Sequence, residues 1–584
     1  MERIDYIDEW NIAENYFSEE SLGKLEVNMA MGNGYLGVRN CHEESYVTEK
    51  RNMFVAGIFN KFSKKEVTEL ANMPDISKIS VWLNGKRLTL NRGRVTQYRR
   101  VFNYRNGESV RSFIWESETG FSVRFIFKKF VSMYNKHLIV TEMTAENLGK
   151  QATMAVQSGI DGTFTNTGSQ HFEEGEKRYL DNQFLYLQTQ TTEKKTKVAL
   201  ATCHKLNKAH QTEPSMKRRQ LYENKEFDLL ENETVTFTKY SLLKTGQDLE
   251  YTGKDYLRQG LIDELNSITR ERYRDLLSAS ATVWEKIWEE SKTEIRGDTQ
   301  DALLLNAARY HLHIMTPVHD NRLNISGKGL SGEGYKGHTF WDTEIFILPY
   351  FVYTFPHWAK SLVTYRLKGL GAAKENADLK GYSGALYPWE SAWLSDGEVT
   401  PKFGGIDVVS GKRREVLTGK IEHHITGDVI YGLMQYLKAT NDIEMKKNAF
   451  SLLMETAIFW TSRVNYNKQL DRYEILDVIG PDEYKEHVNN NAYTNYLAKY
   501  NLDVALRAYA ESKNIELKNK YKNQFNIIKE IANKLYLPVP NKEGILPQDD
   551  NYLKKQMIDL TKYFEAEEVN LNNSYFSLKH VPTA

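Results

Sequence analysis

The densest group of residues able to do chemistry lies in one long loop, residues 324–346, which contains His338, Trp341, Asp342 and Glu344. An indole face can stack on the C–H groups of a pyranose ring, while a carboxylate accepts two hydrogen bonds from adjacent hydroxyls. This mixture is typical of a sugar-binding site. An alternative stays open, in which Trp341 is a core aromatic and Asp342 caps the helix that the following TEIFILPYF predicts.

The glycines of the same loop, Gly327, Gly329, Gly332 and Gly334, raise the question of a nucleotide site. No predicted strand precedes them, and neither the GxGxxG nor the GxxxxGK[ST] order is present. A phosphate-cradling nucleotide loop is therefore disfavoured.

Two further loops combine acidic and aromatic residues. Residues 381–401 carry Trp389, Glu390, Trp393, Asp396 and Glu398. Residues 476–496 place Asp482 and Glu483 after a Gly-Pro turn and just before a predicted helix, among Tyr484, His487, Asn490 and Tyr493. A carboxyl group partly buried there would have a raised pKa and serve as a general acid. An acidic pair before a helix is also a common cap, so this alternative stays open too.

Neither the histidines nor the cysteines predict a metal site. His423 and His424 are adjacent, and adjacent side chains point to different faces of a helix or strand, so hydrogen-bonded or sugar-contacting roles are favoured. Cys41 and Cys203 are far apart and lack metal-type or redox spacing, which excludes a disulfide framework.

The elements that must position these loops change in type along the chain. Residues 1–255 are predicted to form an N-terminal antiparallel β-sandwich, because short runs alternate apolar and polar side chains, as at Phe125 and Phe127. Asn84-Gly85 in VWLNGKRLTL supplies the two positive-φ residues of a tight hairpin turn. No βαβ alternation appears, which disfavours a parallel nucleotide-binding sheet.

From residue 256 apolar residues recur at a spacing of three or four, which predicts a helical linker over 256–297. Residues 298–584 contain recurring helical runs separated by long polar loops. Paired helices of this length suit a toroid of helical hairpins, and polar loops on such a frame commonly carry catalytic groups.

Composition limits the partners. The 584 residues carry 77 Lys+Arg and 77 Asp+Glu, spread along the whole length, so nucleic acid and anionic membranes are disfavoured and a small ligand is expected. The N-terminus lacks a basic region followed by an apolar core, and no stretch approaches 18 uninterrupted apolar residues. These features predict a soluble protein in the reducing cytoplasm.

Taken together, five segments resemble glycoside hydrolase family 65, the maltose, trehalose and kojibiose phosphorylases. They are MGNGYLGVRN from residue 31, GKGLSGEGYKGHTFWDTEIFILPYF at 327–351, YPWES at 387–391, IEHHITGDVIYGLMQYL at 421–437 and VIGPDEYKEHVNNNAYTN at 478–495. The long Gly/Trp/Asp block and the GPDEY block stand in the family's order, and the resemblance runs essentially end to end.

The resemblance implies a β-sandwich, a helical linker and an (α/α)6 barrel that carries the site. It also implies inverting phosphorolysis of a disaccharide, in which Glu483 protonates the glycosidic oxygen while inorganic phosphate attacks the anomeric carbon from the opposite face. Trp341 and Asp342 match the positions that hold the transferred glucosyl ring, with His338 and Glu344 as further groups of that substrate site. Phosphate is a co-substrate, no metal or organic cofactor is implied, and a homodimer is expected.

The sequence departs from the family pattern at its end. Residues 571–584, LNNSYFSLKHVPTA, keep Lys579, have His580 where the family has glutamine, and then lose the match. We therefore expect a C-terminally truncated chain with an incomplete barrel. Lys579 is carried over as a sugar contact, and the phosphate-binding residues stay unassigned.

Two other functions stay open beside the phosphorylase. An inverting hydrolase needs a second carboxylate as base at about 6.5–9.5 Å from the acid, for which Glu390 or Glu398 can be nominated. A sugar-binding remnant without turnover would keep the acid and glucose loops only. Among linkages, the YPWES loop favours a kojibiose or trehalose type over maltose.

Overall fold

The structure is a computed structural model that describes residues 3–406 and 411–556, and these residues form two compact units. The first unit contains the described residues up to 372 together with 389–401 and 432–445; the second contains 373–388, the described part of 402–431, and 446–556. In these segments no helix is both long and apolar enough to cross a membrane.

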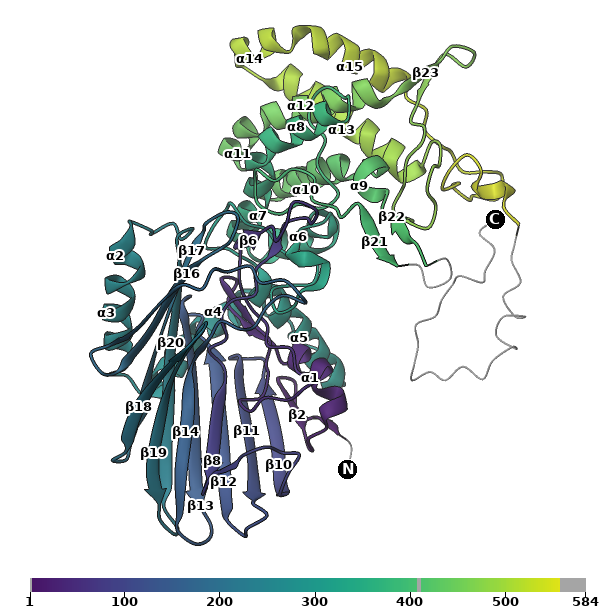
Figure 1. Ribbon diagram of the computed structural model, residues 1–584. Coiled ribbons are helices and arrows are strands. Elements are labelled where there is room, and N and C mark those ends of the chain that lie inside the picture. The colour runs from purple at the N-terminus through teal and green to yellow at the C-terminus, as the bar shows by residue number, and fades with distance from the viewer. Residues whose placement is uncertain (1–2, 407–410, 557–584) are drawn as a thin grey trace. The chain divides into compact units, whose positions relative to one another are not determined.

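Two antiparallel sheets make up most of the first unit, and Figure 1 shows them as layers of long strands. In the described residues, the larger sheet runs in the spatial order β1 (Ile4–Tyr6), β2 (Asn11–Glu14), β10 (Arg94–Asn103), β11 (Glu108–Glu116), β12 (Ser122–Val131), β13 (Leu138–Asn147), β20 (Thr234–Thr245), β17 (Lys197–Leu206), β16 (Phe184–Gln190) and β15 (Glu176–Leu180). The smaller sheet runs β18 (Gln211–Lys217), β19 (Gln220–Leu229), β14 (Ala152–Asp161), β8 (Ile79–Leu83) and β9 (Lys86–Arg87).

Alternating side chains explain why the two sheets pack together. Along β11 and β12 every second residue is buried, and Phe113 lies opposite Phe125 in the pairing register. These rings join Val156 of β14 and Phe227 of β19 in one hydrophobic core, so both sheets contribute to it. Removal of this apolar surface from water favours the sandwich. The predicted N-terminal antiparallel β-sandwich is confirmed.

The hairpin predicted at VWLNGKRLTL is also confirmed. Leu83 of β8 pairs with Lys86 of β9, so two residues make the turn. Asn84 and Gly85 have φ angles of 46° and 75°, the left-handed conformation that such a turn needs.

The other regular elements of the two units are helices and short two- and three-stranded sheets. The helices are η1 (Glu19–Ser21), α1 (Leu22–Asn28), α2 (Lys254–Leu257), α3 (Gln259–Ile268), α4 (Tyr273–Glu290), α5 (Thr299–Met315), η2 (Gly334–Gly337), η3 (Thr343–Ile347), α6 (Leu348–Thr354), α7 (Pro356–Lys368), α8 (Leu370–Leu379), α9 (Thr418–Ile421), α10 (Ile425–Thr440), α11 (Ile443–Asn448), α12 (Phe450–Arg463), α13 (Ala492–Glu511), α14 (Ile515–Lys520), α15 (Lys522–Lys534) and η4 (Tyr552–Lys554). The short strands are β3 (Met31–Gly32), β4 (Leu36–Val38), β5 (Met53–Val55), β6 (Phe59–Asn60), β7 (Glu69–Leu70), β21 (Phe403–Ile406), β22 (Arg413–Glu415), β23 (Asn465–Asn467) and β24 (Arg472–Glu474).

The helices of the second unit surround their own core. Trp460 of α12 is fully buried and donates a hydrogen bond from Nε1 to Oδ1 of Asn501 on α13, at 3.1 Å. Leu502 of α13 and Ile528 of α15 belong to the same apolar cluster. The predicted change from β to helical structure along the chain is therefore confirmed.

The sandwich also buries charge. The Arg111 guanidinium on β11 donates hydrogen bonds to Glu43 and Glu44, both at 2.6 Å, and Lys129 of β12 pairs with Glu43 at 2.8 Å. All four side chains are almost fully buried. A buried ion pair that loses one partner leaves an uncompensated charge in a medium of low dielectric constant.

We therefore expect Arg111→Ala to lower the free energy of unfolding of the full chain by about 3–5 kcal/mol, measured by urea denaturation. Arg124→Ala is the matched control on the neighbouring strand, because its pair with Glu146 lies at the surface, and it should cost no more than about 1 kcal/mol. Equal effects of the two substitutions would contradict this account of the buried charges.

Candidate active site

Trp341 and Asp342 lead directly into η3, a five-residue π-helix. The Asp342 side chain makes no capping hydrogen bond, and the residue is exposed. The capping alternative for Asp342 is therefore wrong. Trp341 is half-buried, with its ring 5.3 Å from that of Phe346. A π-helical turn is rare and is often found at functional sites. Here the indole of Trp341 and the carboxylate of Asp342 directly precede such a turn.

A buried ion pair fixes this turn. Glu344, two residues after Asp342, receives two hydrogen bonds from the Arg366 guanidinium of α7, at 2.7 and 3.0 Å. The same guanidinium donates to the Phe340 carbonyl at 3.1 Å. Arg366 therefore holds the chain just before Trp341 and just after Asp342, and a bidentate fork gives this link a defined geometry.

His338 is fully buried and both of its ring nitrogens have protein partners. Nδ1 lies 2.6 Å from Glu390 Oε2, and Nε2 lies 2.8 Å from the Thr68 carbonyl oxygen, to which it donates. Burial raises the pKa of Glu390, and the hydrogen bond with His338 partly opposes this. The contacts of His338 fix the loop that precedes Trp341.

The carboxylates nominated as a hydrolytic base are both engaged by the protein. Glu390 is tied to His338, as described above. Glu398 accepts hydrogen bonds from the Trp389 backbone N–H at 2.9 Å and from the Thr400 hydroxyl at 2.7 Å. Glu390 thus links its loop to that of His338, and Glu398 stabilises its own loop.

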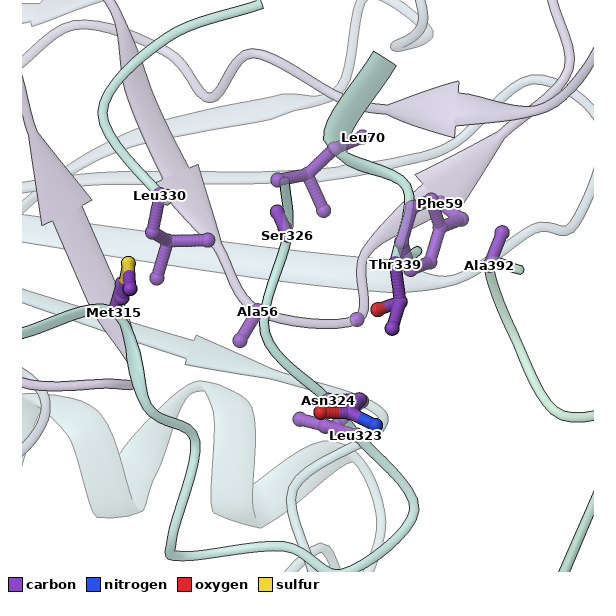
Figure 2. Close-up of a pocket in the computed structure, with 11 residues that line it drawn as sticks. Ala56, Phe59, Leu70, Met315, Leu323, Asn324, Ser326, Leu330, Thr339 and Ala392 are labelled. Carbon is purple, nitrogen blue, oxygen red and sulfur yellow. The ribbon is translucent and has the colours of Figure 1, made fainter. Parts of the chain in front are cut away.

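Beneath the glycine-rich loop lies a small cavity in the first unit, shown in Figure 2. Its volume is about 10 Å³, room for at most one water molecule. Apolar side chains dominate its wall, among them Phe59, Leu70, Leu323, Leu330 and Ala392. The cavity is too small for a sugar, so the underside of this loop is packed core.

In the second unit, the loop with Asp482 and Glu483 is closed by a bridge between Val478 and Val488. Asp482 accepts hydrogen bonds from the Tyr484 backbone N–H at 3.2 Å and from the Gln548 side chain at 3.0 Å, whereas Glu483 is exposed. These hydrogen bonds fix the Asp482 side chain, and the Glu483 side chain is exposed to solvent.

The capping alternative for this acidic pair is wrong. The N-cap of α13 is Asn491, whose side chain accepts a hydrogen bond from the Thr494 N–H at 3.0 Å. Gly480 allows this arrangement, because a Cβ atom there would lie 2.2 Å from the Asn491 side chain.

The surroundings expected for Glu483 also differ from the structure. The sequence predicts partial burial, whereas Glu483 is exposed. Three of the residues expected around it also bind other groups: His487 binds Asp477 at 2.6 Å, Asn490 binds Asp550 at 2.8 Å and Tyr493 binds Asp428 at 2.8 Å.

A buried cluster that the sequence analysis did not identify lies in the turn from α9 into α10. His424 places Nε2 2.9 Å from Glu422 Oε1 and Nδ1 2.6 Å from Asp428 Oδ2. None of the three side chains is more than 2% exposed. Burial opposes a charge on His424, but Asp428 and Glu422 outweigh it and raise the His424 pKa to about 9. The imidazole is therefore a cation held between two carboxyl groups.

This cluster is electrostatically linked to Glu483. Burial raises the pKa of Glu422 to about 7, His424 opposes the rise, and the negative charges of Glu483 and Asp428 add to it. Glu422 and Glu483 thus form an interacting pair of carboxyl groups. The spacing of His424 and Asp428, four residues apart at a helix start, is the one sequence signal that pointed to this cluster.

His423 has different surroundings, as expected for a neighbouring residue. Its Nδ1 accepts a hydrogen bond from Arg463 Nε at 3.0 Å, and its Nε2 lies 2.9 Å from the Lys420 carbonyl. Burial and the Arg463 charge lower the His423 pKa well below its usual value. In residues 3–406 and 411–556 no group of three or more His, Cys, Asp or Glu is arranged to hold a metal ion. Lys579 lies outside the described residues.

Comparisons with known proteins place this geometry in a family. The family model for the glycosyl hydrolase family 65 central catalytic domain matches residues 306–581, and that for the N-terminal domain matches residues 12–287. The chain belongs to glycoside hydrolase family 65. It is 42% identical to the kojibiose phosphorylase of Halothermothrix orenii (strain H 168), over 95% of this chain and 73% of that protein. It is 37% identical to the kojibiose phosphorylase of Escherichia coli K12, over 94% and 72%.

A solved structure shares the fold of this family 65 chain. The structure of a proposed kojibiose phosphorylase from the human microbiome aligns with a TM-score of 0.87 and 21% identity, over 98% of this chain and 76% of that one. The family and its relatives make this protein a glycoside phosphorylase that acts on a disaccharide and phosphate.

The buried His424 cation predicts how stability depends on pH. Because its folded pKa of about 9 lies above the unfolded value near 6.5, its contribution is complete below about pH 6.5 and is lost as pH rises through 9. Glu422 acts in the same direction, since its contribution is lost as pH rises through about 7.

By calorimetry of the full chain, we expect the unfolding temperature to fall by at least about 3 °C between pH 6.5 and 9. His424→Gln should flatten this slope. His423→Gln is the matched control, because His423 is neutral across the range, and it should leave the slope unchanged. The same slope in the wild type and His424→Gln would contradict the buried cation.

Proposed function

We propose that this phosphorylase cleaves kojibiose by inverting phosphorolysis, releasing β-glucose 1-phosphate and glucose. The similarity to two kojibiose phosphorylases over more than nine-tenths of the chain carries the proposal. An exposed Glu483 on a closed loop and an exposed Asp342 beside Trp341 supply groups suited to it.

In the reaction, Glu483 is the general acid. Its proton moves to the glycosidic oxygen as the bond from that oxygen to the anomeric carbon breaks, and an oxygen of inorganic phosphate bonds to the anomeric carbon from the opposite face. The α-linkage becomes a β-phosphate, and Glu483 is left ionised until it takes a proton from solvent. Phosphate is a co-substrate, and we propose no metal or organic cofactor.

We assign substrate binding to the residues that the family resemblance indicated. The Trp341 ring stacks on the transferred glucosyl unit, and the Asp342 carboxylate accepts hydrogen bonds from its hydroxyls. Glu344 and His338 belong to this substrate site and act by holding the turn through Arg366 and Glu390. Lys579 is retained as a further sugar contact.

Three further expectations stay predictions. They are an (α/α)6 barrel in the helical part of the chain, a homodimer, and a place in the reducing cytoplasm. Light scattering of the purified protein tests the second directly.

Hydrolysis is the second candidate, and the contacts of its nominated bases count against it. Glu390 is bound by His338 of the loop 324–346, and Glu398 is bound by groups of its own loop. A general base has to accept a proton from water, so a carboxylate held in this way is poorly placed for that role.

The decisive measurement is release of β-glucose 1-phosphate from kojibiose, nigerose, trehalose and maltose, with and without phosphate. We expect phosphate-dependent release, highest with kojibiose. Glu483→Gln should lower kcat by about 10²–10⁴-fold, because general acid catalysis contributes about that much. Asp482→Asn is the matched control on the same loop and should retain at least about a tenth of the activity.

Each other outcome would identify a different function. Equal cleavage without phosphate would mean a hydrolase. Sugar binding without turnover by the folded protein would mean a binding remnant. Preference for another disaccharide would correct the substrate and leave the reaction class intact.

Asp342→Asn tests the substrate site. Loss of charge-assisted hydrogen bonds should lower kcat/KM for the disaccharide by about 10–100-fold, since hydrogen bonds to a charged group contribute about 1.5–3 kcal/mol. Asp378→Asn, at an exposed acid of α8, is the control and should leave kcat/KM unchanged. Unchanged kinetics in Asp342→Asn would remove this residue from the site.

A further inference from the structure

Phe346 is a large apolar residue at the surface of the π-turn. It lies within η3 and is 65% exposed, although Thr343 and Glu344 of the same turn are buried. The centroid of its ring lies 5.3 Å from that of Trp341, and the two ring planes are tilted by 55°. An exposed phenylalanine gains little from the hydrophobic effect. Its contact with the indole that we assign to the sugar therefore suggests a role in binding.

The π-turn itself produces this contact. The Leu348 N–H donates to the Thr343 carbonyl, five residues earlier, which is the hydrogen bond that defines a π-turn. On an α-helix, residues five apart point in directions about 140° apart, so Phe346 would face away from Trp341. The wider π-turn moves residues five apart toward one face, and the two rings meet.

The main chain beside Trp341 is fixed by other contacts. Arg366 binds the loop on both sides of Trp341, as described above. The backbones of Thr339 and Ser391 exchange two hydrogen bonds, at 2.8 and 2.9 Å. These contacts set the position of the Trp341 Cα atom. They do not set the direction of the indole, because a tryptophan side chain turns about two torsion angles of its own.

Stacking on a sugar requires a defined orientation of the indole. The flat face of the ring has to lie against the C–H groups of the pyranose, and each rotamer of the side chain presents a different surface. A second ring that packs against the indole limits these rotamers before the sugar binds. A side chain that is ordered in advance loses less conformational freedom on binding, which raises the affinity.

We propose that Phe346 is a positioning residue that holds the Trp341 indole in its sugar-stacking orientation. This inference rests on the proposed function, which assigns the transferred glucosyl unit to Trp341. In this role Phe346 affects binding of the disaccharide, and it affects neither phosphate binding nor proton transfer. Loss of its ring should therefore weaken the ground state and the transition state by the same factor.

The first test measures steady-state phosphorolysis of kojibiose by the full chain. Phe346→Ala should raise KM for kojibiose by about two- to tenfold, since an aromatic pair contributes about that factor. The kcat and the KM for phosphate should stay within about twofold of the wild type. Phe346→Tyr keeps the ring and should keep the wild-type KM. Because Phe346 is exposed, its truncation does not open a cavity in the core.

Tyr353→Ala is the matched control for this test. Tyr353 lies on α6, directly after the π-turn, and is 72% exposed, so the control also removes an aromatic ring from the surface. It should leave kcat and both KM values unchanged. The proposal would be overturned by an unchanged kojibiose KM in Phe346→Ala, by an equal rise in Phe346→Tyr, or by a loss confined to kcat.

The second test asks whether Phe346 acts through Trp341. In a double-mutant cycle, kcat/KM for kojibiose is compared among the wild type, Trp341→Ala, Phe346→Ala and the double variant. Trp341→Ala should lower kcat/KM, and adding Phe346→Ala should then lower it by less than about twofold further. Full additivity of the two losses would mean that Phe346 acts independently of the indole, and the proposal would be wrong.

These tests also distinguish this proposal from the proposed function. If the protein does not cleave kojibiose, the same cycle is measured as kojibiose binding without phosphate, by isothermal titration calorimetry. If the wild type binds no kojibiose, or if Trp341→Ala has no effect, the assignment of Trp341 to the sugar is wrong and the role of Phe346 falls with it. If Trp341→Ala weakens binding and Phe346→Ala does not, that assignment stands and only the role of Phe346 falls.

Discussion

The His424 cation, buried between two carboxyl groups, is the interaction on which the start of α10 in the second unit depends. Three ionisable side chains without access to water are tolerable only when each charge faces its opposite at hydrogen-bond distance. That requirement fixes the turn from α9 into α10. It also ties α13 to the cluster, because Tyr493 completes the coordination of Asp428.

In the first unit, a buried carboxylate is likewise balanced by an opposite charge, that of Arg366. Arg366 forms an ion pair with Glu344 in the interior, while Asp342, two residues earlier, is exposed. On an ordinary α-helix, residues two apart lie on nearly opposite faces, and the π-turn keeps one acid inward and the other outward. One acid is thus used for structure, and its neighbour Asp342 is left exposed.

Much of this fold is readable from sequence, because local patterns determine it. The Asn84-Gly85 turn, the alternation along β12 and the apolar spacing of α13 each predict an element that the structure contains. Arg366 and Glu422 were not predicted, because each matters through a partner that the fold supplies. The capping interpretation of Asp342 failed for the same reason, since it ignored the pull of Arg366 on Glu344.

The difference between the expected partial burial of Glu483 and its observed exposure is the more instructive one. A carboxyl among aromatic and amide residues suggests an acid with a pKa raised by burial, but Glu483 is exposed. A single carboxyl group cannot be both buried in the protein and accessible to substrate. In this unit the two conditions fall on different carboxyl groups, because Glu422 is buried and Glu483 is exposed. Burial raises the pKa of Glu422 to about 7 even against the opposing charge of His424, while Asp428 helps to keep His424 charged.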